Sequence, residues 1–411
     1  MSHRWIRALA GLTAALALVG LLSATAQGKS FAGVVRDVPS AGAGVSHAQG
    51  SPIARIANLP YGGGSVLHTN RTHLIFWQPA GLAFDPGFGV AIATFLARVA
   101  ADSRKPSNVY GLSGQYRDSG GPAAYNSSYA GAVLDTDPLP ANGCRPPVTG
   151  PGWRVCLSDS QLSREISNVV TSRGLPVTAR DIYFLVTPAG LGSCEGLGPD
   201  GCALGGSGSG YCAYHSQAGS LLYAVIPYSA VPGHCQSDNP RPNGSTADPV
   251  ISMISHEHNE TVTDPFGNAW VDSFNNENGD LCLTQFGPTL GGSGAAVWNE
   301  TIAGGHYYLQ EEWSNENGSC QPRDESDRIS FSIPRSPRAG KALAFIAHGS
   351  DPDGAIVSYY WSFGDGHSRR SHALHAFRRA GVYRVVLRST DSAGNWAFSG
   401  RTIRVRKARG R

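Results

Sequence analysis

The residues most able to do chemistry lie in the stretch SHEHNETVTDP, which begins at Ser255. On a helix, residues four positions apart share one face at about 6 Å, so His256 and Glu260 can bind one metal ion. Imidazole nitrogen and carboxylate oxygen are both ordinary zinc ligands, and Glu257 would lie beside a bound water as general base. The pattern predicts a divalent metal site with catalytic Glu257.

The motif differs from the HExxH helix of zinc peptidases, because Glu260 stands where the second His would be. Its negative charge makes a bound ion less electrophilic, raises the pKa of bound water and favours harder cations. We expect zinc, with calcium or manganese as alternatives, and weaker peptidase chemistry than HExxH supports. A polar helix face that is merely solvated is the non-functional alternative.

A third metal ligand must come from outside this helix. Glu277 is the preferred candidate and Asp280 the second, because the segment NNENGDLC can return across the helix. Asp264 lies eight residues beyond His256, about 12 Å along a straight helix, and is expected to be too far away.

Three other histidines are interpreted as outside the site. His215 in GYCAYHS and His234 are expected to be exposed loop residues, although either is a weaker candidate ligand. His258 lies about 200° round the helix from His256 and is expected to face solvent or the rim of the site.

The site helix is predicted over residues 249–263, because Asp248 can cap it, Pro249 suits its first turn and Pro265 prevents continuation. Further helices are predicted within 85–103 and 158–176 by apolar spacing and capping residues. Predicted strands are 71–79, 107–116, 129–136, 181–188 and 221–228. This order predicts a mixed three-layer α/β domain, for which a zincin-like arrangement is one option.

The N-terminus has the features of a secretory signal. Arg4 and Arg7 precede an apolar run that ends at Ala24-Thr25-Ala26, so residues 1–26 are predicted to be cleaved. An uncleaved anchor is the alternative, and no membrane span is expected after cleavage. Residues 27–60 are rich in small residues and are predicted to form a flexible leader without regular structure. The chain is therefore expected to be secreted, extracellular or in the cell wall.

Cysteine usage also indicates export, because all 8 cysteines lie between Cys144 and Cys320. Proximity in sequence is the basis for predicting four disulfides, and a structural zinc site is the alternative. The predicted pairs are Cys144 with Cys156, Cys194 with Cys202, Cys212 with Cys235, and Cys282 with Cys320. The formal net charge of +3 over 411 residues gives no global field for nucleic acid.

Beyond Cys320 the composition changes to short alternating strands separated by Asp/Gly turns. The motif WSFGDG at Trp361–Gly366, followed by HAFRRAGVYRVVL and DSAGN, resembles the PKD domain. The resemblance covers residues 330–406 and implies an all-β immunoglobulin-like sandwich that acts as a spacer or binds extracellular protein or polysaccharide. Residues 407–411 form a basic tail.

Residues 61–322 resemble the phosphate-induced protein 1 (EXORDIUM-like) family through segments in a shared order. These include GGGSVLHTNRTHLIFW, CAYHS, HEHNETVTDPFGNAW, ENGDLC and QEEWSNENGSC. The resemblance implies an extracellular protein and a His-Glu-x-x-Glu helix matched by His256, Glu257 and Glu260. It also implies an acidic segment matched by Glu277, Asp280 and Cys282.

Two functions follow from these observations. The first is a secreted metal-dependent, peptidase-like hydrolase in which the PKD domain attaches the enzyme to its substrate or to a cell surface. The second is a non-catalytic extracellular protein that binds cell-wall carbohydrate or protein, because no enzymatic activity is established for the family as a whole.

Overall fold

The computed structural model describes residues 34–36, 58–144, 150, 152–194, 201–203, 210–352 and 354–408. The predicted signal peptide and most of the predicted leader lie outside these residues. Within the leader, strand β1 (Val34–Arg36) pairs antiparallel with strand β9 (Tyr211–Ala218). This differs from the expectation that the leader has no regular structure.

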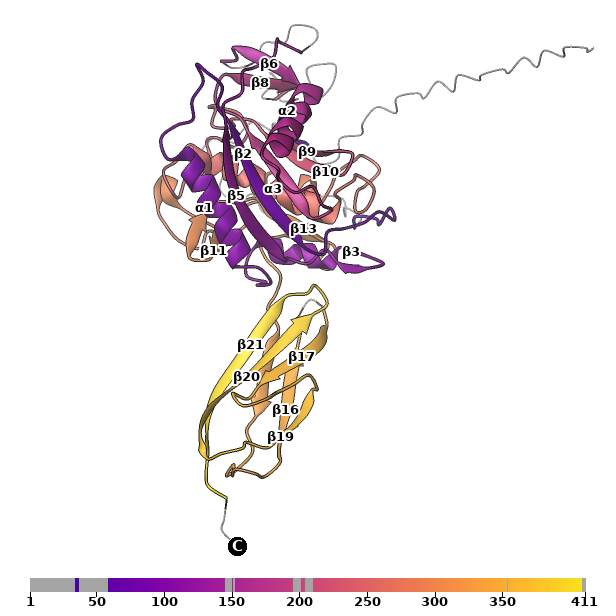
Figure 1. Cartoon of the computed structure of the whole chain (residues 1–411), viewed down its shortest axis with the longest axis vertical. Helices are drawn as coiled ribbons and strands as arrows, with labels where there is room; N and C mark the ends of the chain where they lie inside the picture. Colours follow the sequence, from indigo (N-terminus) through magenta and orange to yellow (C-terminus); the bar gives the residue numbers. More distant parts are fainter. Residues whose placement is uncertain are drawn as a thin grey trace, which may run out of the picture. The chain divides into compact units, whose positions relative to one another are not determined.

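A six-stranded sheet forms the centre of the first domain (Figure 1). Its strand order is β1, β9, β10 (Leu221–Ile226), β7 (Asp181–Val186), β2 (Asn70–Trp77) and β5 (Ser127–Asp135). The last four strands are mutually parallel, whereas β9 runs antiparallel to β10. Every residue of β7 and β10 is buried, as their continuous apolar sequences predict.

Three helices cover this sheet: α1 (Phe88–Ala101), α2 (Asp159–Ser172) and α3 (Ala247–Thr263). Alternation along β9 shows how they are distributed, because successive side chains of a strand point to opposite faces. Tyr214 contacts Asp159 of α2, whereas the next residue, His215, contacts Glu257 of α3. The two helices therefore lie on opposite faces, and α1 packs beside α3. The predicted mixed α/β class is confirmed.

One predicted strand is wrong. Residues 107–116 contain the 3₁₀ helix η1 (Val109–Gln115), which begins with the Asn108 side chain accepting a hydrogen bond from the Tyr110 backbone N–H at 3.1 Å. A Cβ at Gly111 would lie 2.9 Å from Pro106 Cα, so this turn needs the small residue for close approach. Local side-chain capping outweighs the apolar pattern here.

Short elements complete the first domain. They are β3 (Arg117–Asp118), β4 (Gly121–Pro122), β6 (Val155–Ser158), β8 (Leu191–Cys194), η3 (Asp280–Cys282), η4 (Gly294–Ala296), β11 (Glu300–Ile302), β12 (Gly305–Tyr307), β13 (Glu312–Ser314) and β14 (Ser319–Gln321).

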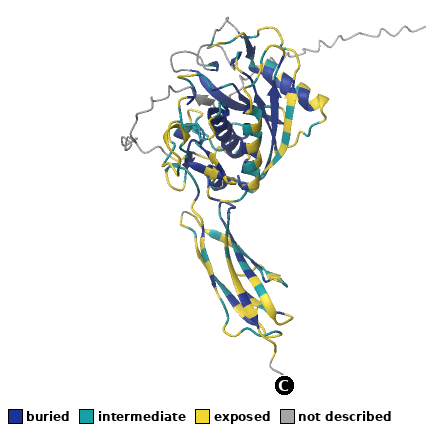
Figure 2. Ribbon diagram, turned by 90° about the vertical axis from the view of Figure 1, so that its left-hand side faces the viewer, coloured by how far each residue is buried: buried dark blue, intermediate teal, exposed yellow. Residues whose placement is uncertain are grey.

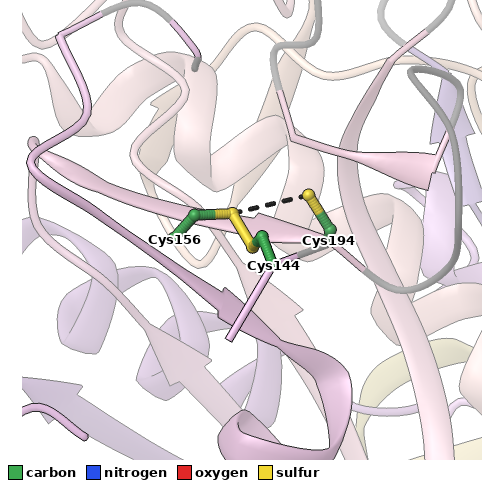
Figure 3. Close-up of side chains that lie close together, drawn as sticks. All are labelled: Cys144, Cys156 and Cys194. Atoms are coloured by element: carbon green, nitrogen blue, oxygen red, sulfur yellow. Dashed lines mark hydrogen bonds between the residues drawn. A yellow bond between two sulfur atoms is a disulfide. The ribbon is translucent and has the colours of Figure 1, made fainter. Parts of the chain in front are cut away.

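All four predicted disulfides are confirmed. Figure 3 shows three of the sulfurs together, with Sγ of Cys156 lying 3.4 Å from Sγ of Cys194. Cys156 is bonded to Cys144 and Cys194 to Cys202, so none of these sulfurs is a thiolate. The alternative of a cysteine zinc site is therefore wrong for these residues.

The C-terminal residues form two antiparallel sheets, as the turn-rich alternating sequence predicts. One contains β15 (Arg328–Ser332), β16 (Leu343–Ser350) and β19 (His372–His375). The other contains β18 (His367–Ser368), β17 (Ile356–Ser362), β20 (Gly381–Asp391) and β21 (Trp396–Val405). The WSFGDG motif supplies Trp361 and Phe363, both fully buried, to the core between the sheets.

A buried ion pair joins two of the central strands. Asp181, at the start of β7, accepts hydrogen bonds from Arg71 Nε at 2.6 Å and from Thr178 Oγ1 at 2.5 Å, and it lies 2.8 Å from His73 Nε2. Burial acts to raise the pKa of Asp181, but hydrogen bonds from Arg71, Thr178 and His73 lower it to about 2. The ionised carboxylate thus stabilises the fold.

We predict that Asp181→Asn lowers the free energy of unfolding by about 2 kcal/mol at pH 7. The folded pKa lies below the unfolded value of about 4, so the stabilisation is present above about pH 4 and is lost as pH falls toward 2. Denaturant unfolding at several pH values checks this. An equally large difference between the two proteins at pH 2 and pH 7 would contradict it.

Candidate metal centre

Helix α3 carries the motif through the interior of the domain, and all 17 of its residues are buried (Figure 2). Glu257 and Glu260 are both 0% exposed, so the alternative of a solvated helix face is wrong. The helix ends where predicted, before Pro265, and Asp264 follows it. Its Oδ1 accepts hydrogen bonds from the backbone N–H groups of Asn268 and Ala269, which fixes the exit of the chain.

The segment after the helix returns to it as predicted, and Asn278 holds it there. The Asn278 side chain accepts a hydrogen bond from Thr263 Oγ1 at 2.8 Å and donates one to Glu312 Oε2 at 2.8 Å. Its carbonyl accepts a hydrogen bond from the Trp313 N–H. Residues on either side of Asn278 therefore face the helix.

Asp280 joins the predicted pair on the helix. Nε2 of His256 lies 2.9 Å from Oε1 of Glu260 and 3.7 Å from Oδ1 of Asp280. The Asp280 backbone N–H donates to the same Glu260 oxygen at 3.1 Å. Behind the ring, Gln310 Nε2 lies 3.1 Å from His256 Nδ1 and donates to the Gly279 carbonyl at 2.7 Å. His256, Glu260 and Asp280 thus converge.

Glu277 is fully buried but faces a different histidine from the predicted one. Its Oε2 lies 3.6 Å from Nε2 of His215. Nδ1 of His215 lies 3.2 Å from Oε2 of Glu257 and 3.8 Å from Oε2 of Glu260. The preferred ligand Glu277 is therefore next to His215, while Asp280 is next to His256.

The interpretation of His215 as an exposed loop residue is wrong, because it lies on β9 and is 1% exposed. A signal for this was present in the sequence. Gly219-Ser220 is a two-residue connection of the kind that joins hairpin strands, and Gly219 has a positive φ of 64°. Recognising the hairpin would have predicted β9 beside β10.

The other two histidines, His258 and His234, lie outside the two groups of candidate ligands. His258 is fully buried, so the expectation that it faces solvent is wrong. Its Nε2 lies 2.9 Å from Asn70 Oδ1, its ring packs edge-on against Phe184, and burial lowers its pKa to about 3. It is a neutral packing residue. His234 is half-buried and belongs to neither group of converging ligands described below.

Two sets of potential ligands meet in this region. One ligand atom each from His256, Glu257 and Glu260 lie within 4.8 Å of one another, and the same holds for His215, Glu260 and Glu277. Asp264, which was expected to be too distant from His256, lies near the second set, since its carbonyl is 3.3 Å from His215 Nε2.

Buried carboxyl groups outnumber buried histidines here. Six carboxyl side chains surround two histidines: Glu257, Glu260, Asp264, Glu277, Asp280 and Glu312. Burial, together with the charge of Glu260, raises the pKa of Glu277 and Asp280 well above the usual range of a carboxyl, and burial raises the pKa of Glu257 to about 7. Such a group is costly to bury unless a cation compensates it.

Several carboxylate oxygens in the group have no hydrogen-bond partner among the described residues. They are Oε1 of Glu257, Oε2 of Glu260, Oδ2 of Asp264, both oxygens of Glu277, Oδ1 of Asp280 and Oε1 of Glu312. Buried polar atoms are nearly always satisfied. The unpartnered oxygens Glu260 Oε2, Glu277 Oε2 and Asp280 Oδ1 lie 3.6–3.8 Å from a histidine nitrogen, which fits a divalent cation. The predicted residues His256, Glu260, Glu277 and Asp280 could hold it, and His215 is the additional ligand candidate.

Comparison with known proteins identifies one family along the chain. A family model for the PKD domain matches residues 329–405, so the chain carries a C-terminal PKD domain. Collagenase ColQ1 of Bacillus cereus (strain Q1) is 33% identical over 85 residues, which is 20% of this chain and 9% of that protein. Microbial collagenase of Vibrio alginolyticus is 38% identical over 68 residues, 16% of this chain and 8% of that protein. The matched segments thus span less than a tenth of either collagenase.

Among solved structures, the PKD1 domain of Vibrio anguillarum Epp is 26% identical and covers 21% of this chain and 100% of that domain, with a TM-score of 0.20. In the part of the chain that the structure describes, no helix combines the length and apolarity needed to cross a membrane.

Gly279 lies unusually close to the candidate ligands. A Cβ at this position would be 2.7 Å from the His256 ring and 2.9 Å from Glu260 Oε1. We predict that Gly279→Ala weakens zinc or manganese binding at least tenfold, because the methyl group displaces ligands of a buried helix. Calorimetric titration checks this. Gly89→Ala in α1 is the control, because its Cβ would meet Phe76 at an ordinary 3.5 Å; equal loss in both variants would contradict the prediction.

Removing divalent cations should destabilise the protein, since a cation that binds only the folded state stabilises it. At a concentration 100 times Kd the stabilisation is about 2.7 kcal/mol, or roughly 5–10 °C in Tm. We predict a decrease of this size after dialysis against a chelator, measured by thermal unfolding, with recovery on adding zinc or manganese. Glu260→Gln should show a much smaller response, and an equal response in that variant would contradict the assignment.

Proposed function

We propose that this chain is a secreted metal-dependent hydrolase, peptidase-like in its chemistry, with the PKD domain attaching it to substrate or to a cell surface. The observation that carries the proposal is the convergence of His256, Glu260 and Asp280 beside Glu257 on a buried helix turn. Zinc is the proposed ion, with manganese and calcium as alternatives. We also propose that residues 61–322 belong with the EXORDIUM-like proteins and that their fold is zincin-like.

The zincin-like fold is supported by the position of α3. The helix directly follows the central strand β10 in the order of regular elements and packs on β9 and β10. Its Glu257 faces the sheet, where β9 contributes His215, whereas its His256 faces Asp280 and Gln310 on the later segments. A metal site between a helix and a mixed sheet is the arrangement that the motif requires.

In the proposed mechanism, His256, Glu260 and Asp280 hold the ion. When bound, a divalent cation polarises a substrate carbonyl and lowers the pKa of water. Glu257 then accepts the proton from the attacking water at Oε1, which has no hydrogen-bond partner among the described residues. Its other oxygen is held 3.2 Å from His215 Nδ1, so His215 acts as a positioning residue for the base.

Substrate must reach a centre that is largely enclosed. His256 and Glu260 have fully buried side chains, whereas the Asp280 side chain is 6% exposed. We therefore expect substrate to approach from the side of Asp280. The chain in that direction, Val271–Asn276, is half-buried to exposed, and Phe274 is 76% exposed.

The proposed substrate is extracellular protein. The relatives named collagenases match segments of this chain, and a protein substrate suits peptidase-like chemistry. Export is supported by the four disulfides, which form and persist in oxidising compartments. The PKD domain would contribute attachment to protein or polysaccharide.

We predict that Glu257→Gln retains bound metal but lowers hydrolysis of a gelatin or mixed-peptide substrate by about 10²–10⁴-fold, the usual contribution of a general base. Metal content is measured by elemental analysis and hydrolysis by mass spectrometry of the products. Glu300→Gln is the matched control, because Glu300 is also a buried glutamate and neither of its oxygens has a hydrogen-bond partner in the described part of the chain, but it lies on β11, outside the site. Unchanged hydrolysis in Glu257→Gln would reject Glu257 as the base.

The second candidate is a non-catalytic extracellular binding protein in which the cation is structural. The burial of the candidate ligands favours it, because a structural ion needs no route for substrate. Retention of the wild-type protein on cell-wall polysaccharides, with no cleavage of any peptide in the mixture, would support this function and reject the hydrolase. Peptide cleavage without retention on any polymer would reject it.

A further inference from the structure

We propose that the centre binds two divalent cations and that Glu260 bridges them. The proposal deepens the proposed function, on which it depends for the first ion, and assigns a second ion beside β9. It rests on the two oxygens of Glu260, which face different histidines. Oε1 lies 2.9 Å from His256 Nε2, and Oε2 lies 3.8 Å from His215 Nδ1.

The first position lies on the side of Oε1. His256 and Asp280 complete it, since their facing atoms are 3.7 Å apart. Two atoms that each lie about 2.1 Å from a tetrahedral ion are separated by about 3.4 Å, so this spacing accommodates a zinc-sized cation with little movement.

The second position lies on the side of Oε2. His215 and Glu277 provide its other ligands, and one atom from each of these residues and Glu260 lie within 4.8 Å of one another. Nε2 of His215, 3.6 Å from Glu277 Oε2, is the proposed ligand nitrogen, which leaves Nδ1 to donate to Glu257. Both Glu277 oxygens are fully buried without a hydrogen-bond partner among the described residues, and Oδ2 of the neighbouring Asp264 is also unpartnered. Glu277 Oε2 lies 3.6 Å from His215 Nε2, so we assign these oxygens to the second position rather than to the first.

The charges favour two cations over one. Four carboxyl groups, Glu257, Glu260, Glu277 and Asp280, lie within 4 Å of the two histidines, which are neutral when they bind metal. One divalent cation compensates two carboxylates, whereas two cations compensate four. A shared carboxylate is also the geometry of two-metal sites, in which the ions are about 3.5–4 Å apart.

The experiment measures manganese bound to the purified full chain, by elemental analysis after loading and removal of free ion. We expect two equivalents in the wild type, one in Glu277→Gln and one in Asp280→Asn. Electron paramagnetic resonance should show a spin-coupled manganese pair in the wild type and an isolated ion in each variant. Glu300→Gln is the control and should retain two equivalents and the coupled spectrum.

Binding of only one manganese equivalent by the wild type would overturn the second position. So would Glu277→Gln binding two equivalents with the same coupled spectrum as the wild type. Each variant is checked for folding by circular dichroism and for its four disulfides by mass spectrometry. His215→Gln, which changes the same position from the sheet, provides a second variant if Glu277→Gln does not fold, and it should also bind one equivalent.

The number of bound ions and the hydrolytic activity can be tested separately. Two equivalents with no hydrolysis of any substrate would support the two-cation centre and reject the hydrolase. One equivalent with hydrolysis that depends on Glu257 would support the hydrolase and reject the second ion.

Discussion

The interior of the first domain is organised around buried negative charge. Carboxyl groups on α3 and on the returning segment lie in a region from which solvent is excluded, and their mutual repulsion is strong at low dielectric. Neither helix propensity nor apolar packing favours burying several carboxyl groups close together. Such an arrangement is tolerated when a cation binds the same oxygens, and a cation bound here would stabilise the fold.

The surrounding structure is suited to holding these groups against each other. The β9–β10 hairpin brings His215 to the face of the sheet that α3 covers. Asn278 connects the end of α3 to β13, and the Cys282–Cys320 disulfide ties η3 to β14. Asp280 therefore lies on a segment fixed at both sides, which limits how far its carboxylate can move from His256.

The PKD domain is stabilised by apolar packing. Its core is aromatic, with Trp361, Phe345 and Phe363 packed between two sheets. Its sequence motif coincides with core and turn positions, so the motif can be recognised locally. The candidate metal centre has no such local signature beyond the helix, because its candidate ligands come from a strand, a helix and a loop.

The sequence by itself determined the elements whose signals are local. The apolar spacing in α1, the ends of α3, the strands β7 and β10, and the disulfides between neighbouring cysteines were all predictable, since each depends on residues close in the chain. It also identified His256 and Glu260 as a pair, with Glu277 preferred over Asp280 as the third group. Only the tertiary structure decided that His215 faces Glu257 and Glu277, that His258 is buried, and that Glu277 and Asp280 lie beside different histidines. The reason is that strand pairing and burial are set by contacts between distant segments, and a hairpin missed in the sequence hides the direction of every side chain on its strand.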